Sequence, residues 1–147
     1  MVLVTKNTQV FSHQARVYVE DTDAGGIVFY ANYLKYMERA RTEFLRSLGY
    51  HKPALFDGMQ FVVRSVELVY QKPAVLDDIL DISANLTKLS KVSFEMQQNI
   101  FRDGDLLVEA KVKIACISND VKRPLAMPEE IHQTLKNMFA KPELNSE

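Results

Sequence analysis

The sequence predicts an α+β fold in which an antiparallel sheet wraps around one long central helix. Residues 31–48 place apolar side chains at helical spacing, over an unusually wide arc. Five other segments alternate apolar and polar side chains, as strands with one buried face do. The links between the last four of these segments are too short for helical crossovers, so we expect the strands to be antiparallel.

The size and composition of the chain are typical of one globular domain. It has 147 residues, of which 47% are hydrophobic and 25% charged. A chain of this length removes roughly 70% of its unfolded surface from water on folding, so apolar burial suffices without a disulfide or a structural metal. No repeat, low-complexity tract or linker divides it. We expect a single domain over residues 1–147, with its core at about 13–125.

The first strand is predicted from Ala15 onwards. Ala15, Val17 and Val19 would face the core, and the residues between them would face solvent. The strand ends at Asp21–Gly26, whose Asp, Thr and Gly residues bond their own backbone or tolerate unusual dihedral angles. This segment therefore predicts a tight turn before the helix.

The long helix is predicted over residues 31–48, and Gly49 supplies its stop. Its apolar arc is wider than a helix resting on a flat surface needs, so we expect a curved sheet to surround it. Arg41 lies inside this arc, and we expect it to form an ion pair with Glu38. The side chains of the arc are Tyr33, Leu34, Tyr36, Met37, Ala40, Phe44, Leu45 and Leu48.

Four strands follow the helix as a predicted meander, and their ranges are Gln60–Tyr70, Ile79–Thr87, Val92–Phe101 and Leu106–Ser118. Alternation is clearest in the second and the last of them, and Cys116 falls on the apolar face of the last. Asp103 and Gly104 predict a tight hairpin turn. A C-terminal helix is predicted at about 128–139, beginning at Pro128, with an apolar stripe of Ile131, Leu135 and Met138.

Charge and hydropathy exclude several classes of function. The 18 Lys and Arg against 19 Asp and Glu give a net charge of -1, so we expect no nucleic-acid partner. No apolar run approaches the roughly 20 residues of a membrane-spanning helix. Met1–Val4 is too short for a signal-peptide core, and the single Cys116 cannot form an intramolecular disulfide, so we expect a cytoplasmic protein.

A metal site is not expected either. His13, His51 and His132 lie far apart in the sequence and lack metal-ligand spacing. A calcium loop counted from Asp21 fails at its fifth position, Gly25, which has no ligand side chain.

The densest cluster of chemically useful residues is Glu20–Gly26, just before the N-terminus of the long helix. A helix N-terminus carries unpaired N–H groups and a partial positive charge, so it can hold a developing oxyanion. A carboxylate beside it, Asp21 or Asp23, can act as general base or nucleophile in acyl transfer. The same carboxylates can instead cap the helix or close the turn.

The cluster belongs to a longer motif, which reads VYVEDTDAGGIV from Val17 to Val28 and continues as YANYL over Tyr30–Leu34 and ERAR over Glu38–Arg41. This motif resembles that of the hotdog-fold acyl-CoA thioesterases, in particular the 4-hydroxybenzoyl-CoA thioesterase branch and its Tol-Pal-associated relatives. The resemblance covers about residues 13–125 and is strongest over 17–48.

The resemblance implies a hotdog fold whose subunits pair their sheets, with the active site at the dimer interface and a homotetramer as the common assembly. It implies that Asp23 is the catalytic carboxylate and that the backbone N–H of Tyr30 polarises the thioester carbonyl. In the family, the turn flanked here by Lys88 and Lys91 contributes contacts to the CoA nucleotide. Many Tol-Pal-associated members have His at the position of Tyr30, whereas the 4-hydroxybenzoyl-CoA branch has an aromatic residue there.

The expected function is therefore that of a thioester hydrolase, which converts an acyl-CoA or aryl-CoA to a free acid and CoA without a metal or redox cofactor. Two alternatives stay open at this point. One is a non-catalytic acyl-CoA-binding or envelope-associated scaffold with the same fold. The other is a hotdog dehydratase, which needs a catalytic His that the helix entrance does not offer.

Overall fold

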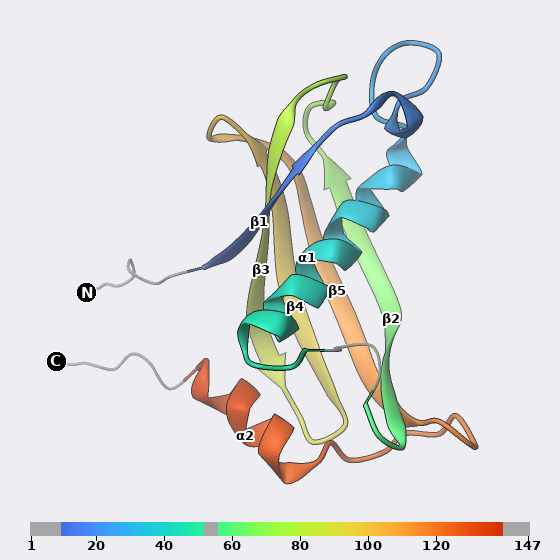
Figure 1. Cartoon of the computed structure of the whole chain (residues 1–147), viewed down its shortest axis with the longest axis vertical. Coiled ribbons are helices and arrows are strands. Elements are labelled where there is room, and N and C mark those ends of the chain that lie inside the picture. The colour runs from blue at the N-terminus through green and yellow to red at the C-terminus, as the bar shows by residue number, and fades with distance from the viewer. Residues whose placement is uncertain (1–9, 52–55, 140–147) are drawn as a thin grey trace, which may run out of the picture.

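The computed structural model describes residues 10–51 and 56–139, and Met1–Val4 lies outside these residues. The described elements are β1 (Phe11–Arg16), the 3-10 turns η2 (Val19–Asp21) and η3 (Tyr30–Asn32), α1 (Tyr33–Ser47), β2 (Met59–Tyr70), β3 (Ile79–Leu89), β4 (Ser93–Arg102), β5 (Asp105–Ser118) and α2 (Glu129–Asn137). All strand pairs are antiparallel, and the sheet curves around α1 (Figure 1). The predicted class of fold is confirmed.

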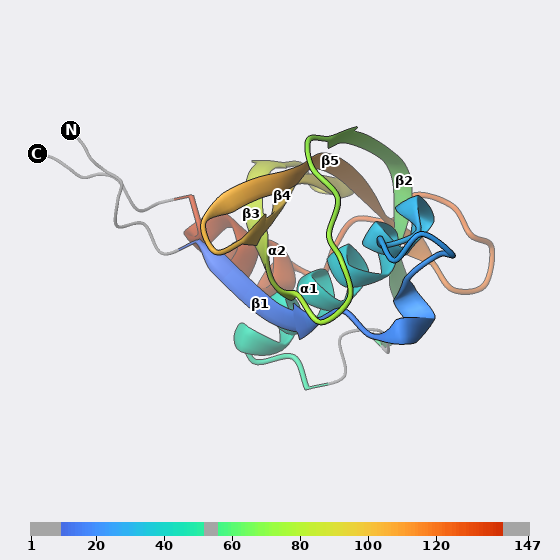
Figure 2. The same cartoon turned by 90° about the horizontal axis from the view of Figure 1, so that it is seen from above.

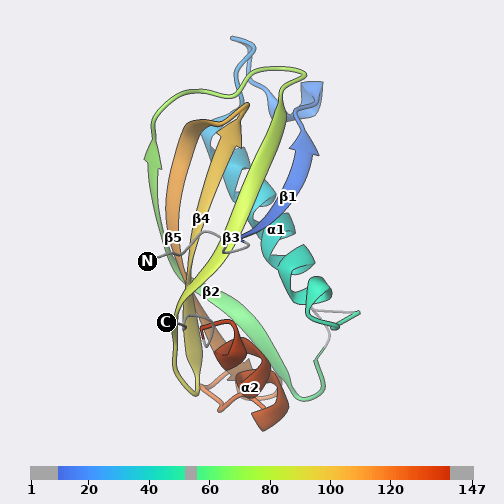
Figure 3. The ribbon, with the colours of Figure 1, turned by 90° about the vertical axis from the view of Figure 1, so that its left-hand side faces the viewer.

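The order of strands in the sheet differs from the predicted four-stranded meander. β3, β4 and β5 are neighbours in sequence order, but β2 pairs with β5 at one edge and β1 pairs with β3 at the other. Because α1 follows β1 and precedes β2, placing these strands on opposite edges lets the sheet close around the helix (Figure 2). The link from β2 to β3, residues 71–78, therefore arches over the end of the sheet (Figure 3).

The first strand begins and ends earlier than its alternation predicts. Val17 is fully buried, as expected, but Val19 is 73% exposed. The cause is local, because the carboxylate of Asp21 accepts a hydrogen bond from the backbone N–H of Tyr18 at 2.9 Å. This bond turns the backbone into η2, so the extended conformation ends at Tyr18.

The helix α1 confirms most of the predicted arc, of which Tyr33, Tyr36, Met37, Ala40, Phe44 and Leu45 are buried. Leu48 packs against this core from the end of the helix, whereas Leu34 is 42% exposed and was wrongly assigned to the buried arc. Leu34 lies in the first turn of α1 and is not among the buried residues of the helix. Gly49 ends the helix with φ of 106°, as predicted.

Arg41 does not form the predicted ion pair with Glu38. Its Nη1 donates instead to Oε1 of Gln98 at 3.0 Å, and no carboxylate among the described residues lies within 4.0 Å of it. Glu38 is exposed, so its charge stays in solvent. Burial lowers the pKa of the Arg41 guanidinium, and the charge of Glu38 opposes this effect only through space.

The remaining sequence features are largely confirmed. Asp103 and Gly104, with φ of 51° and 84°, form the tight turn between β4 and β5. Cys116 is buried on the apolar face of β5. α2 buries Ile131 and Leu135, but the third residue of the predicted stripe, Met138, lies just beyond the helix and is exposed. No helix in residues 10–51 and 56–139 is long and apolar enough to cross a membrane.

Candidate active site

The loop between η2 and η3 carries the candidate carboxylate, Asp23. Its Oδ1 accepts a hydrogen bond from the backbone N–H of Gly25 at 2.8 Å, and its own N–H donates to Ile27 O at 2.8 Å. Asp23 thus closes a turn, as the alternative interpretation expects. The side chain is nevertheless exposed, and its Oδ2 accepts no hydrogen bond from the described residues. This oxygen is available to a substrate or to water.

The other candidate carboxylate, that of Asp21, is buried and not exposed to solvent. In addition to the bond that this carboxylate accepts from Tyr18, the backbone carbonyl of Asp21 accepts hydrogen bonds from Phe29 N–H at 3.0 Å and Asn32 Nδ2 at 2.9 Å. These contacts join the start of the loop to the turn before α1. The sequence did not separate the two aspartates, whereas the structure makes Asp21 the residue that organises the loop.

Tyr36, on α1, has a buried hydroxyl group near the Asp21 carboxylate. Its Oη has no hydrogen-bond partner among the described residues. Burial raises the pKa of the Tyr36 phenol, and the nearby Asp21 carboxylate raises it further. The phenol is therefore uncharged at neutral pH, and it adds no negative charge near the Asp21 carboxylate.

Tyr30 opens the 3-10 turn that leads into α1. Its backbone N–H has no acceptor among the described residues, and its carbonyl accepts a hydrogen bond from Tyr70 Oη at 3.2 Å. An unpaired N–H at the start of a helical segment, with the helix dipole behind it, is suited to bind a carbonyl oxygen that gains negative charge. Tyr30 is 64% exposed, and its ring packs against that of Phe29 with 4.8 Å between the ring centroids.

A cavity of about 390 Å³ lies beside Tyr30, and its lining is mostly apolar or aromatic: Ile27, Val28, Tyr30, Tyr33, Tyr70, Gln71, Lys72 and Pro73. The rings of Tyr33 and Tyr70 pack with 5.5 Å between their centroids. Burial raises the pKa of both phenols, so neither supplies a phenolate near neutral pH. The sequence did not identify Tyr70 as a site residue, because no local pattern links it to the loop 40 positions away.

Lys88 and Lys91 lie at the other end of the sheet. β3 begins beside the loop, where Val17 N–H bonds Asp78 O, and its 11 residues end at Leu89. At about 3.3 Å per residue, the lysines are roughly 30 Å from Asp23 along the strand. A single chain therefore does not bring the predicted nucleotide contacts to the predicted catalytic residue.

Metal ligation has no support in the part of the chain that the structure describes. No group of three or more His, Cys, Asp or Glu side chains is placed to hold a metal ion there. His13 lies on β1, His51 follows α1 and His132 lies on α2, and none of the three lines the cavity.

Known proteins show strong similarity to this chain. Residues 25–109 match the Thioesterase superfamily. The acyl-CoA thioesterase YbgC of Haemophilus influenzae is 39% identical over 123 residues, which are 82% of this chain and 90% of that protein. The acyl-CoA thioester hydrolase YbgC of Escherichia coli O6:H1 is 41% identical over 127 residues, or 85% and 95% of the two chains. The crystal structure of a probable thioesterase from Bartonella henselae, 39% identical, superposes with a TM-score of 0.77 over 82% of this chain and 100% of that chain.

Proposed function

This chain belongs to the thioesterase superfamily, and on that premise we propose that Asp23 is the catalytic carboxylate of an acyl-CoA thioesterase. The fold is the hotdog fold that the motif implied, and the activity is thioester hydrolysis, which releases a free acid and CoA. The observation that carries the role of Asp23 is the arrangement of the loop. One segment presents an exposed carboxylate oxygen at Asp23 and an unpaired N–H at Tyr30, and Tyr30 together with Ile27 and Val28 of the same segment lines the apolar cavity.

The proposed chemistry begins with the thioester carbonyl oxygen hydrogen-bonded to the Tyr30 N–H. As a general base, Asp23 takes a proton from water while the water oxygen attacks the carbonyl carbon. As a nucleophile, Asp23 attacks that carbon itself, and water then hydrolyses the mixed anhydride. In both routes the C–S bond breaks and the leaving CoA thiolate takes up a proton. The Tyr30 N–H stabilises the negative charge on the carbonyl oxygen.

The cavity is proposed to hold the acyl group. Its volume is within the range of small-molecule sites, and its lining is apolar with few polar groups. The hydrogen bond from Tyr70 Oη to Tyr30 O joins the cavity wall to the residue that offers the N–H donor. An acyl group that fits this wall is therefore placed with its carbonyl near that donor.

We propose that the working form is a homo-oligomer, a dimer or a dimer of dimers. β2 pairs with β5 on one side only in the described structure, so its other edge is open. Exposed apolar side chains surround the site, namely Ile27, Phe29, Tyr30, Val69, Tyr70, Val75 and Leu76. A second copy that covers this surface would also allow its Lys88 and Lys91 to approach the CoA phosphates.

The cytoplasm stays the proposed location, since Cys116 is buried and the sequence has no second cysteine for an intramolecular disulfide.

The test compares Asp23→Asn with the wild type, because Asn retains the Oδ1 acceptor that closes the turn with Gly25. Release of CoA is followed across a panel of alkyl and aryl thioesters. We expect turnover to fall by about 10² to 10⁴, which is the usual contribution of a general base, with an unchanged melting temperature. Asp120→Asn is the matched control, since Asp120 bonds the next backbone N–H in a remote turn.

The alternatives lead to other results on the same panel. A scaffold binds acyl-CoA without turnover, and a dehydratase hydrates an enoyl-CoA. If Asp23→Asn retains near wild-type turnover, Asp23 is a turn residue only and its proposed catalytic role is wrong.

A further inference from the structure

The link from β2 to β3 forms backbone hydrogen bonds with the loop between η2 and η3, which carries Asp23 and is called the catalytic loop below. Within residues 71–78, the carbonyl of the fully buried Ala74 accepts a hydrogen bond from Val28 N–H at 2.9 Å. Leu76 N–H donates to Gly26 O at 3.4 Å. The backbone of the link thus fixes both ends of the short segment Gly26–Val28, which lies between Asp23 and Tyr30 in the chain.

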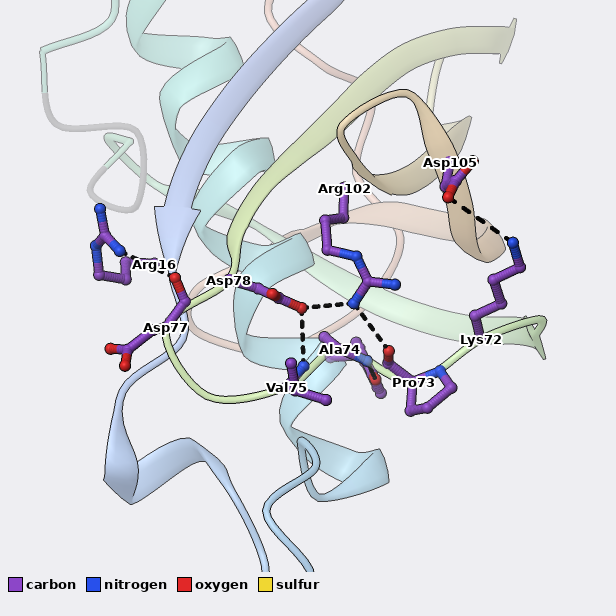
Figure 4. Close-up of polar contacts among 10 residues, drawn as sticks. Arg16, Lys72, Pro73, Ala74, Val75, Asp77, Asp78, Arg102 and Asp105 are labelled. Carbon is purple, nitrogen blue, oxygen red and sulfur yellow. Dashed lines mark hydrogen bonds and ion pairs between the residues drawn. The ribbon is translucent and has the colours of Figure 1, made fainter.

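The link is held in part by backbone bonds to Val17 and by the Ala74 N–H, which donates to Tyr33 Oη at 3.0 Å. Its other anchor is Arg102, the last residue of β4. Arg102 Nη1 donates to Asp78 Oδ2 at 2.6 Å and to Pro73 O at 3.2 Å (Figure 4). Asp78 Oδ2 also accepts the backbone N–H of Val75 at 2.9 Å. One guanidinium nitrogen therefore ties the two ends of the link together, with Ala74 between them.

The environment of this ion pair makes it stronger than an ordinary surface contact. The side chains of Arg102 and Asp78 are only 26% and 16% exposed. Charge-assisted hydrogen bonds that are short and shielded from solvent are stronger than exposed ion pairs. The hydrogen bond to Asp78 raises the pKa of Arg102, so the guanidinium keeps its charge. The neighbouring pair of Lys72 and Asp105 is longer, at 3.8 Å, and more exposed.

We propose that Arg102 is a positioning residue for thioester hydrolysis, because it clamps the link whose Ala74 carbonyl fixes the segment between Asp23 and Tyr30. Arg102 does not touch the reacting atoms. It sets the distance between the carboxylate and the N–H donor, and through Pro73 it also shapes one wall of the acyl cavity. This inference rests on the proposed roles of Asp23 and Tyr30.

The experiment compares Arg102→Met and Arg102→Lys with the control Arg46→Met, which removes an exposed ion pair with Glu43 on α1 and an exposed hydrogen bond to His51 O. Small displacements of catalytic groups are costly, so we expect Arg102→Met to lower kcat/KM by about 10-fold to 100-fold, mainly through kcat. Arg102→Lys retains the charge but lacks the rigid fork of the guanidinium, so we expect partial recovery. Arg46→Met is expected to keep wild-type kinetics.

Amide hydrogen exchange supplies a readout that needs no turnover. In Arg102→Met, the amides of Val28 and Ala74 should exchange faster, while those in the second half of α1 should not change. Unaltered exchange at these two amides overturns the proposal. The proposal is also overturned if the activity loss of Arg102→Met equals its fraction of unfolded protein and disappears on cooling. The two proposals can fail separately. If exchange at Val28 rises in Arg102→Met but Asp23→Asn keeps its activity, the role of Arg102 in holding the link is confirmed and the proposed catalytic role of Asp23 is wrong.

Discussion

Gln98 joins the helix to the sheet, and Gln98→Leu is expected to destabilise the protein strongly. The Gln98 side chain is fully buried, accepts a hydrogen bond from Arg41, and donates to Met37 O at 3.1 Å and to Ser83 O at 3.3 Å. Leu has a similar size but no polar atoms. It therefore leaves the Arg41 guanidinium and the Ser83 carbonyl without this partner.

The magnitude follows from the groups that lose their partner. The Met37 carbonyl keeps its helical hydrogen bond, so the loss concerns mainly two groups. Each buried group left unsatisfied costs about 1–3 kcal/mol, and partial access of Arg41 to solvent reduces its share, which gives about 2–4 kcal/mol in total. Arg41→Met alone leaves only the Gln98 oxygen unpaired, at about 1–2 kcal/mol. Glu38→Gln should change the free energy of unfolding by less than about 0.5 kcal/mol.

Urea unfolding followed by circular dichroism measures these free energies, at one protein concentration because subunit association adds to stability. The double variant Arg41→Met/Gln98→Leu should cost less than the sum of the single variants, by about 1 kcal/mol or more. Arg46→Met, which breaks the exposed pair with Glu43 and an exposed hydrogen bond to His51 O, is the control and should cost about 1 kcal/mol. A coupling near zero between Arg41 and Gln98, or a large one between Arg41 and Glu38, would refute this account.

Three further predictions concern the partner subunit, the CoA tail and pH. Sedimentation should show a dimer or tetramer at assay concentrations, and a stable, active monomer would contradict the proposed assembly. Replacing Lys88 and Lys91 together with Ala should raise KM for CoA esters with little change in kcat, less so at high salt, whereas thioesters without the nucleotide should be unaffected. Equal losses on both substrate types would assign the lysines to the fold. Burial raises the pKa of the Cys116 thiol, so its contribution to the free energy of unfolding is complete below about pH 8.5 and is lost as the pH rises further. The loss of stability at alkaline pH should therefore be smaller in Cys116→Ala than in the wild type. An identical loss in the two proteins would argue against the raised pKa.

The sequence predicted the elements of the fold better than their arrangement. Alternation along β3 and β5 identified the buried faces correctly, because a period of two residues reports directly which side chains face the core. The same pattern does not report which strand lies next to which, so the place of β2 beside β5 was missed. Val19 was misplaced because one side-chain bond to the backbone outweighed an otherwise regular alternation.

The candidate site shows the same limit. The motif located the loop and the start of the helix, and it favoured Asp23 over Asp21 only through a family resemblance. Burial and hydrogen bonding of Asp21 separate the two carboxylates physically. Helical spacing proposed Glu38 as the partner of Arg41, whereas the real partner, Gln98, is 57 positions away on β4. Contacts of that range depend on the strand order, which local patterns do not specify.

Because β2 pairs with β5, the chain cannot complete its sheet in the order in which a ribosome delivers it. The hairpins β3–β4 and β4–β5 close over short tight turns, whereas the contact of Met59 with Ser118 must close a loop that includes both of them. The nascent helix α1 emerges early, with an apolar face whose partner strand β3 and whose bonded residue Gln98 on β4 are made only later. We expect the catalytic loop to become ordered late in synthesis, and α1 to be the segment on which a chaperone would act before then.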